Sequence, residues 1–243
     1  MNIDLIQERK REIVERFGQW TAHNIQLQGD TYTIDKRVVG DEFQLRRIVQ
    51  ITSDIAGEPL ENLRILDLAC LEGLYAIEFA HRKAKVVAIE GREANIKKAR
   101  FSKEVLSLEN LELIQDDVRN LSKEKHGNFD VVLCLGILYH LDVPDVFTLI
   151  ENIAEVCQRF TIIDTHVSRA GEEFYIHNGN KYFGIRIQEH RADSISEERA
   201  RNLWASLDNA KSFWLTRPSL YNLLAHVGFT SVYECHYPRE VYP

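Results

Sequence analysis

Short apolar runs alternate with helical patterns through the middle of the chain. Runs rich in Val, Ile and Leu occur at residues 64–68, 85–89, 111–115, 129–135 and 160–164, with charged segments of helical periodicity between them. Strands that alternate with helices in this way are typical of βαβ units. We therefore predict a doubly wound, Rossmann-like α/β fold with a mainly parallel sheet.

The segments on either side of this core differ from it. Residues 4–17 and 42–56 have the periodicity of amphipathic helices. Residues 165–217 are rich in aromatic side chains and irregular in pattern, which favours an insertion above the carboxyl ends of the strands. A helix over 218–227 and a strand over 229–235 are expected to follow. A single domain over 1–243 is predicted, made of a helical arm (1–58), a Rossmann-like core (59–164), an aromatic lid (165–217) and a closing helix and strand (218–243).

The turn after the first predicted strand restricts the type of cofactor. Residues 66–73 have the sequence LDLACLEG. A dinucleotide fingerprint needs glycine where the backbone lies against a pyrophosphate. Here Ala69, Leu71 and Leu74 occupy the glycine positions, and the carboxylate of Asp67 would repel a phosphate. The turn therefore argues against NAD or FAD.

Acidic residues also follow the next two predicted strands. Glu90 ends the second strand, where a carboxylate can accept hydrogen bonds from both hydroxyls of a ribose. Asp116 and Asp117 follow the third strand. These positions indicate a nucleoside-like ligand without phosphate.

These segments resemble, in order and spacing, the motifs of class I S-adenosylmethionine (SAM)-dependent methyltransferases. LDLACLEG is similar to the first motif of that family, and the run over residues 129–141 is similar to its fourth-strand motif. The resemblance covers about residues 63–164. It implies an enzyme that uses SAM and releases S-adenosylhomocysteine (SAH), with no metal expected.

The resemblance also implies which residues hold the cofactor. Glu90 would bind the ribose, and Asp117 the adenine amino group, with Asp116 as the alternative. Asp67 would orient the methionine amino group, or would simply cap the following helix. The set predicted for the cofactor is Asp67, Ala69, Cys70, Gly73, Glu90, Gly91, Asp116, Asp117, Val118 and Leu135.

Candidates for catalysis follow the fourth and fifth predicted strands. Histidine is the side chain best suited to proton abstraction near neutral pH. We therefore predict His140, beside Tyr139, as the general base, with His166 as a second candidate. In the alternative interpretation His140 only pins the loop before Asp142.

Aromatic residues outside the core are candidates for contact with the substrate. Amino-terminal arms of the resembled family often fold over the ligands, which suggests this role for Trp20, His23 and Tyr32. Tyr175 would contribute from the lid. In the alternative interpretation Trp20 and Tyr32 anchor the first helix to the sheet. The basic residues on the helix over 92–106 are expected to form a solvated face; they are Arg92, Lys97, Lys98, Arg100 and Lys103.

Composition restricts the partners and the compartment. The formal charge of −7 makes nucleic acid an unfavourable partner. The four cysteines are far apart, as expected of free thiols in a reducing compartment. No signal-peptide pattern is present, and the longest apolar run, 131–138, is much shorter than the ~20 residues that span a membrane. We expect a cytoplasmic monomer or homodimer.

The leading hypothesis is SAM-dependent methylation of a small molecule, with oxygen as the preferred acceptor atom over nitrogen or carbon. A second hypothesis follows from LGILYH (135–140), which is similar to a motif of tRNA wobble-uridine carboxymethyltransferases that use a carboxylated SAM. A third is a SAM-binding protein without catalysis, because few residues remain for the antiparallel last strand of the family.

Overall fold

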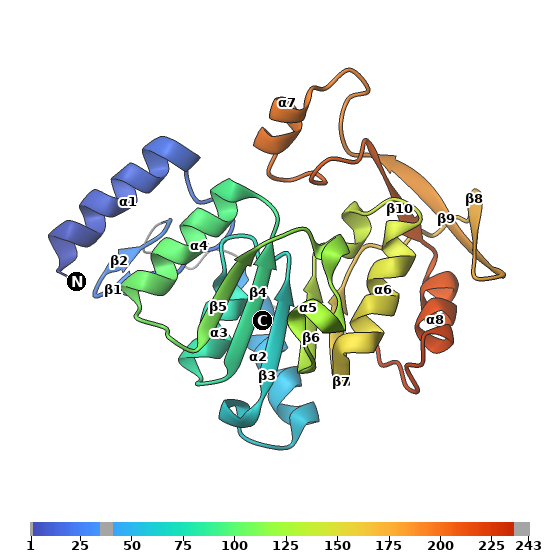
Figure 1. Ribbon diagram of the computed structural model, residues 1–243, viewed down its shortest axis with the longest axis horizontal. Coiled ribbons are helices and arrows are strands. Elements are labelled where there is room, and N and C mark those ends of the chain that lie inside the picture. The colour runs from blue at the N-terminus through green and yellow to red at the C-terminus, as the bar shows by residue number, and fades with distance from the viewer. Residues whose placement is uncertain (1, 35–40, 236–243) are drawn as a thin grey trace, which may run out of the picture.

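A parallel sheet of five strands forms the centre of the computed structural model, which describes residues 2–34 and 41–235 (Figure 1). The strand order is β5-β4-β3-β6-β7, and every neighbouring pair is parallel. This arrangement confirms the predicted Rossmann-like fold, and it places a topological switch point between β3 and β6. The strands are β3 (Arg64–Leu68), β4 (Lys85–Glu90), β5 (Leu111–Gln115), β6 (Phe129–Leu135) and β7 (Cys157–Asp164).

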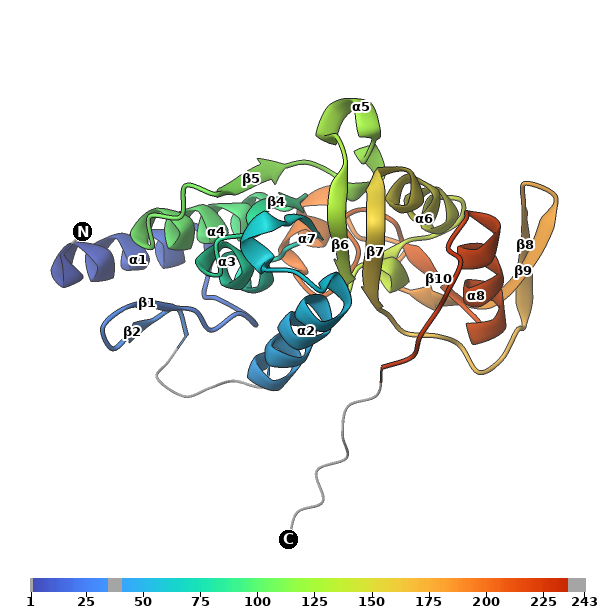
Figure 2. The ribbon, with the colours of Figure 1, turned by 90° about the horizontal axis from the view of Figure 1, so that it is seen from below.

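Helices cover both faces of this sheet (Figure 2). Ile65 of β3 joins an apolar cluster with residues of α2 and α3, whereas Leu66 and Leu68 join a second cluster with residues of α6 and α8. Alternate residues of one strand therefore pack on opposite faces. The helices are α1 (Ile3–Phe17), α2 (Asp41–Ala56), α3 (Leu74–His81), α4 (Glu93–Val105), α5 (Lys123–His126), α6 (Asp145–Val156), α7 (Ser196–Arg201) and α8 (Arg217–His226), with 3-10 turns η1 (Leu60–Asn62), η2 (Val118–Asn120) and η3 (Leu138–His140). Within residues 2–34 and 41–235 no helix combines the length and apolar character needed to cross a bilayer.

The amino-terminal arm contains the expected helix and extended pieces. Asn2 caps the start of helix α1, where its side chain accepts a hydrogen bond from the Leu5 amide at 2.9 Å. A short hairpin follows, made of β1 (Gln26–Gln28) and β2 (Thr31–Tyr32). Helix α1 lies along α4, so the arm covers the edge of the sheet that ends in β5 (Figure 1).

The insertion over 165–217 is more regular than predicted. It contains an antiparallel sheet of β8 (Glu173–His177), β9 (Asn180–Gln188) and β10 (Lys211–Leu215). The strand order in this sheet is β10-β9-β8. The expectation of irregular structure was wrong, because β9 alternates between buried and exposed residues along its central part. Helix α7 and the segment up to β10 lie apart from this sheet, towards α4 (Figure 1).

The predicted closing strand is not formed. Residues 229–235 have no strand pairing, and residues 231–235 are exposed. This segment buries no face against the rest of the protein, so the prediction of a strand there was wrong. Within the described residues, the central sheet therefore ends at β7 without an antiparallel last strand. Strand β7 also begins at Cys157, before the predicted residue 160.

Candidate active site

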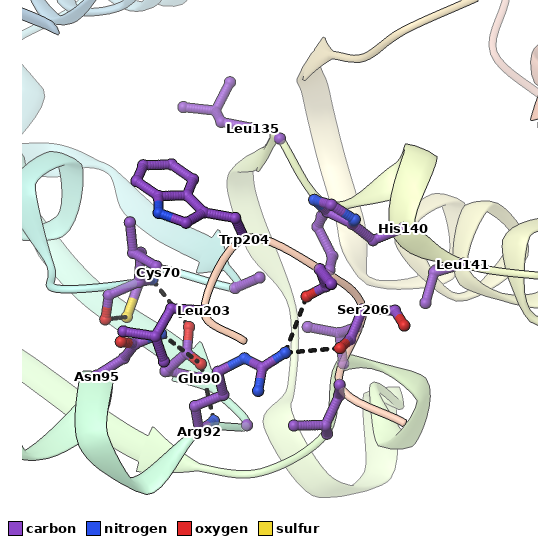
Figure 3. A pocket seen from close by; sticks show the side chains of 18 of the residues that line it. Cys70, Glu90, Arg92, Asn95, Leu135, His140, Leu141, Leu203, Trp204 and Ser206 are labelled. Carbon is purple, nitrogen blue, oxygen red and sulfur yellow. Dashed lines mark hydrogen bonds between the residues drawn. The ribbon is translucent and has the colours of Figure 1, made fainter. Parts of the chain in front are cut away.

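A pocket of about 320 Å³ lies at the carboxyl ends of the central strands. The ends of β3, β4 and β6 form its floor, and the arm supplies Ala22 and His23. The segment over 203–209, which precedes β10, closes the opposite side. Figure 3 shows Trp204 of this segment and His140 on either side of the cavity. The pocket therefore occupies the crevice in which open α/β sheets bind their ligands.

The turn after β3 lines the pocket and has an unusual backbone conformation. Ala69 and Leu71 both have left-handed backbone angles, with φ of 53° and 50°. The Leu71 amide donates to Glu90 at 2.9 Å, and the Cys70 amide donates to the Ile89 carbonyl at 3.0 Å. Strand β4 therefore fixes the turn that follows β3. Gly73 does not line the pocket but starts α3 with φ of 90°.

Two buried carboxylates, Asp67 and Glu90, line the pocket beside this turn. Asp67 accepts a hydrogen bond from the Ala76 amide at 3.1 Å, and burial raises its pKa to about 7, with a further contribution from the charge of Glu90. Burial also raises the pKa of Glu90, which accepts from the Arg92 amide at 2.8 Å. A cation or a hydroxyl donor beside each carboxylate would stabilise its ionised form. A ligand that joins a nucleoside to an amino acid would supply both, through its ammonium group and its ribose. The nearby Asn95 has a buried Oδ1 without a partner among the described residues, which also fits a ligand that donates hydrogen bonds.

Asp116 and Asp117, the two candidates for contact with adenine, have different surroundings. Asp117 lines the pocket together with Val118, and Asp116 does not. Asp116 instead pairs with Lys125 and accepts a hydrogen bond from Asn120 at 2.8 Å, outside the cavity. The geometry therefore favours Asp117 for contact with a ligand.

His140 lies in a hydrogen-bonded chain at the other end of the pocket. Its Nδ1 is 2.9 Å from Oε2 of Glu189, which also accepts from the Ser206 amide at 2.8 Å. Although burial opposes it, the hydrogen bonds from His140 and from the Ser206 amide hold the pKa of Glu189 below its ordinary value. A carboxylate at Nδ1 fixes the ring orientation and leaves Nε2 for the pocket. Sequence reasoning missed Glu189, because it lies 49 residues from His140.

The other two catalytic candidates differ in position. Tyr139 lines the pocket, and burial, with the charges of Asp164 and Glu189, raises its pKa. His166 does not line it, because its ring packs between Tyr139 and Trp214, with centroid distances of 4.4 and 4.8 Å. The structure thus places His166 behind Tyr139.

Of the four residues predicted to contact a substrate, His23 alone lines the pocket. Its Nδ1 accepts a hydrogen bond from the Leu74 amide at 3.1 Å, and burial lowers its pKa to about 4. The structure places the other three elsewhere. Trp20 packs against Phe101 and Tyr175 stacks on Phe147 of α6, so these two rings pack against protein and not against a ligand in the pocket. Tyr32 lines a separate surface hollow beside α1.

A buried ion pair holds the arm against the turn. Lys98 and Glu72 are both fully buried, with Nζ and Oε1 separated by 3.1 Å. Glu72 also accepts hydrogen bonds from the amides of residues 21–23, and Lys98 donates to the Gln19 carbonyl at 2.6 Å. The expectation of a solvated basic face was therefore wrong for Lys98, and also for Arg92, which is 8% exposed. The arm covers Lys98, and the segment before β10 covers Arg92.

Comparison with known proteins places this site in context. Residues 65–159 match the family described as methyltransferase domain. Ubiquinone biosynthesis O-methyltransferase from Acinetobacter baylyi is 32% identical over 108 residues, which are 44% of this chain and 43% of that protein. The enzyme of the same name from Maricaulis maris is 35% identical over 94 residues, 38% of this chain and 37% of that protein. The chain thus spans less than half the length of the curated relatives it matches.

A solved structure is similar over a larger share of the chain. The N-terminal domain of EvdMO1, determined in the presence of SAH and D-fucose, aligns with a TM-score of 0.73 and 25% identity. The alignment covers 95% of this chain and 88% of that one. The bifunctional kinase-methyltransferase WbdD, at 21% identity and a TM-score of 0.50 over 65% of this chain and 35% of that one, shares the fold.

Proposed function

Since residues 65–159 match the methyltransferase domain family, we propose that this chain is a SAM-dependent methyltransferase that methylates a hydroxyl group of a small neutral molecule. The observation that carries the proposal is the pocket at the switch point, with Glu90, Asp117 and Asp67 at one end and the His140–Glu189 pair at the other. Such an arrangement separates a binding end from a proton-accepting end.

The binding end suits the adenosine and amino acid parts of SAM. Glu90 would accept hydrogen bonds from the ribose hydroxyls, and Asp117 from the adenine amino group. Asp67 in its ionised form would pair with the methionine ammonium group. SAM supplies an electrophilic methyl group on a positively charged sulfur, so the protein has to align an acceptor and remove its proton.

The proton-accepting end suits an alcohol. His140 Nε2 would take the proton from the acceptor oxygen, while Glu189 keeps Nδ1 protonated and stabilises the imidazolium that forms. The deprotonated acceptor oxygen then acts as the nucleophile, and the positive charge that forms lies on the His140 imidazolium. Tyr139 and Asp164, which line the same end, could orient a second hydroxyl.

The charge of the pocket favours a neutral acceptor. Among the described residues that line it are five carboxylates and two guanidinium groups, and both arginines, Arg92 and Arg119, are already engaged by other protein groups. A phosphate or carboxylate on the acceptor would be repelled. D-fucose, present with SAH in the EvdMO1 structure, is a neutral polyol and supports a sugar-like acceptor here.

Two experiments test the proposal. In calorimetry with SAH, Glu90→Gln should weaken binding at least tenfold, whereas Glu93→Gln, an acidic residue in the first turn of α4, should not. In an assay of SAH release, neutral sugars should act as acceptors in preference to their phosphate esters. Glu189→Gln should lower kcat by 10²-fold or more with SAH affinity unchanged.

Other outcomes support other functions. Tight SAH binding without turnover on neutral, phenolic or anionic acceptors would favour a SAM-binding protein without catalysis. Retention of bulk tRNA at low salt would favour the tRNA-modifying alternative, which stays a prediction, as do the cytoplasmic location and the oligomeric state.

A further inference from the structure

The two carboxylates expected to hold adenosine share a local pattern. Each is followed two residues later by an arginine, as Glu90–Arg92 and Asp117–Arg119. The arginine amide donates to the carboxylate in both cases, at 2.8 Å for Arg92 and 2.9 Å for Arg119. Each carboxylate is therefore directly connected to the backbone of an arginine.

Arg92 reaches from the end of β4 to the segment that closes the pocket. Its guanidinium donates to the carbonyls of Arg199, Ala205 and Ser206 at 3.0, 2.8 and 2.6 Å. Figure 3 shows this group between Glu90 and the backbone beside Ser206. A planar guanidinium can meet several carbonyls at once, which an ammonium group cannot do with the same geometry.

Arg119 makes a second connection to the same segment. Its Nη2 lies 2.5 Å from Asp117 and 2.8 Å from Asp208. Arg199 in turn donates to the Asp208 carbonyl at 2.6 Å, so the two connections meet within residues 199–209. This segment contributes Trp204, which is 65% exposed, to the pocket wall.

We propose that residues 199–209 are a lid over the cofactor, and that Arg92 and Arg119 are positioning residues that couple its closure to occupancy of Glu90 and Asp117. The inference rests on the proposed function, because the cofactor is taken to bind these two carboxylates. A ligand that contacts the lid binds the closed state more tightly than the open state. By linkage, the ligand must then stabilise closure, and closure must raise its affinity.

The coupling can be measured without turnover. Hydrogen exchange of the amides in 199–209 is followed with and without SAH in the wild type, Arg92→Met, Arg92→Lys and Arg119→Met. Arg82→Met is the matched control, since Arg82 forms an exposed pair with Glu78 on α3. Trp204 fluorescence, obtained as the difference between each protein and its Trp204→Phe variant, reports on the lid independently.

The expected result is slower exchange of 199–209 on SAH binding in the wild type and in the control. In Arg92→Met this protection should be lost, and SAH affinity should fall about tenfold if the closed population falls to a tenth. Arg92→Lys should restore little, because a compact ammonium group cannot reproduce the planar geometry in which the guanidinium meets the three carbonyls. Arg119→Met should show a smaller loss of the same kind, since Asp208 is largely exposed.

Different outcomes contradict the proposed function and the proposed lid. If the wild type does not bind SAH, the proposed function fails. If it binds SAH but exchange of 199–209 is unchanged, the lid fails while the function stands. Equal SAH-dependent protection in the wild type, Arg92→Met and Arg119→Met would show that the arginines serve only the fold. Should Arg92→Met not fold, Arg119→Met alone decides between these outcomes.

Discussion

The ion pair between Glu72 and Lys98 should determine whether the arm stays on the core. Both side chains are fully buried, and the Glu72 carboxylate gathers the amides of residues 21–23 as well as the ammonium group of Lys98. In Lys98→Met the carboxylate stays buried without a cation. Removing one partner of a buried pair costs about 3–5 kcal/mol, out of a typical total of about 5–15 kcal/mol. For a chain of this size the melting temperature should fall by roughly 6–20 °C.

Urea unfolding of three variants measures this cost. Lys97→Met is the matched control, because Lys97 is partly exposed on the same helix, and it should change the free energy of unfolding by less than about 0.5 kcal/mol. Adding Glu72→Gln to Lys98→Met should restore part of the loss, since an amide oxygen still accepts the backbone hydrogen bonds without an unpaired charge. A loss below about 1 kcal/mol in Lys98→Met, as for an exposed pair, would refute the reasoning.

Three further predictions concern single positions. Ala69→Gly should stabilise the protein by about 0.5–1 kcal/mol in thermal unfolding, because φ is 53° there, whereas Ala76→Gly within α3 should destabilise it by about 1 kcal/mol. Since burial raises the pKa of Asp67 from 3.8 to about 7, the folded state binds more protons between these values. The free energy of unfolding should therefore fall as pH rises from about 4 to 7, and Asp67→Asn should flatten this slope. Gly184→Ala should cost about 1–3 kcal/mol in urea unfolding, because a Cβ there would press on the Trp214 carbonyl and the Phe213 ring; an unchanged midpoint would contradict this.

The parts of the site that follow directly from a strand could be predicted from the sequence. Asp67, Glu90 and Asp117 lie within or next to the ends of parallel strands, and parallel strands end at one edge of the sheet. An apolar run with a carboxylate at its end is therefore sufficient to locate such residues. The same argument located Tyr139 and His140 after β6.

Aromatic residues outside the sheet could not be assigned in this way. Trp20 and Tyr175 have the same chemistry as a ligand platform, but they stack on Phe101 and Phe147. Trp204, which does line the pocket, has no pattern that sets it apart. Whether such a ring meets protein or ligand depends on which element covers it, and that depends on the whole fold.

The predictions that were most wrong concern charged residues that bind segments far away in the chain. Lys98 and Arg92 look like members of a solvated helix face, because the sequence of α4 does not reveal what covers it. Lys98, within α4, holds the arm through Glu72 and the Gln19 carbonyl, while Arg92, at the start of the same helix, holds the segment over 199–206. One helix thus anchors both covers of the pocket. The arm residues at 19–23 and this segment lie more than 170 residues apart in the chain, so only their common support on α4 reveals why both charges are buried.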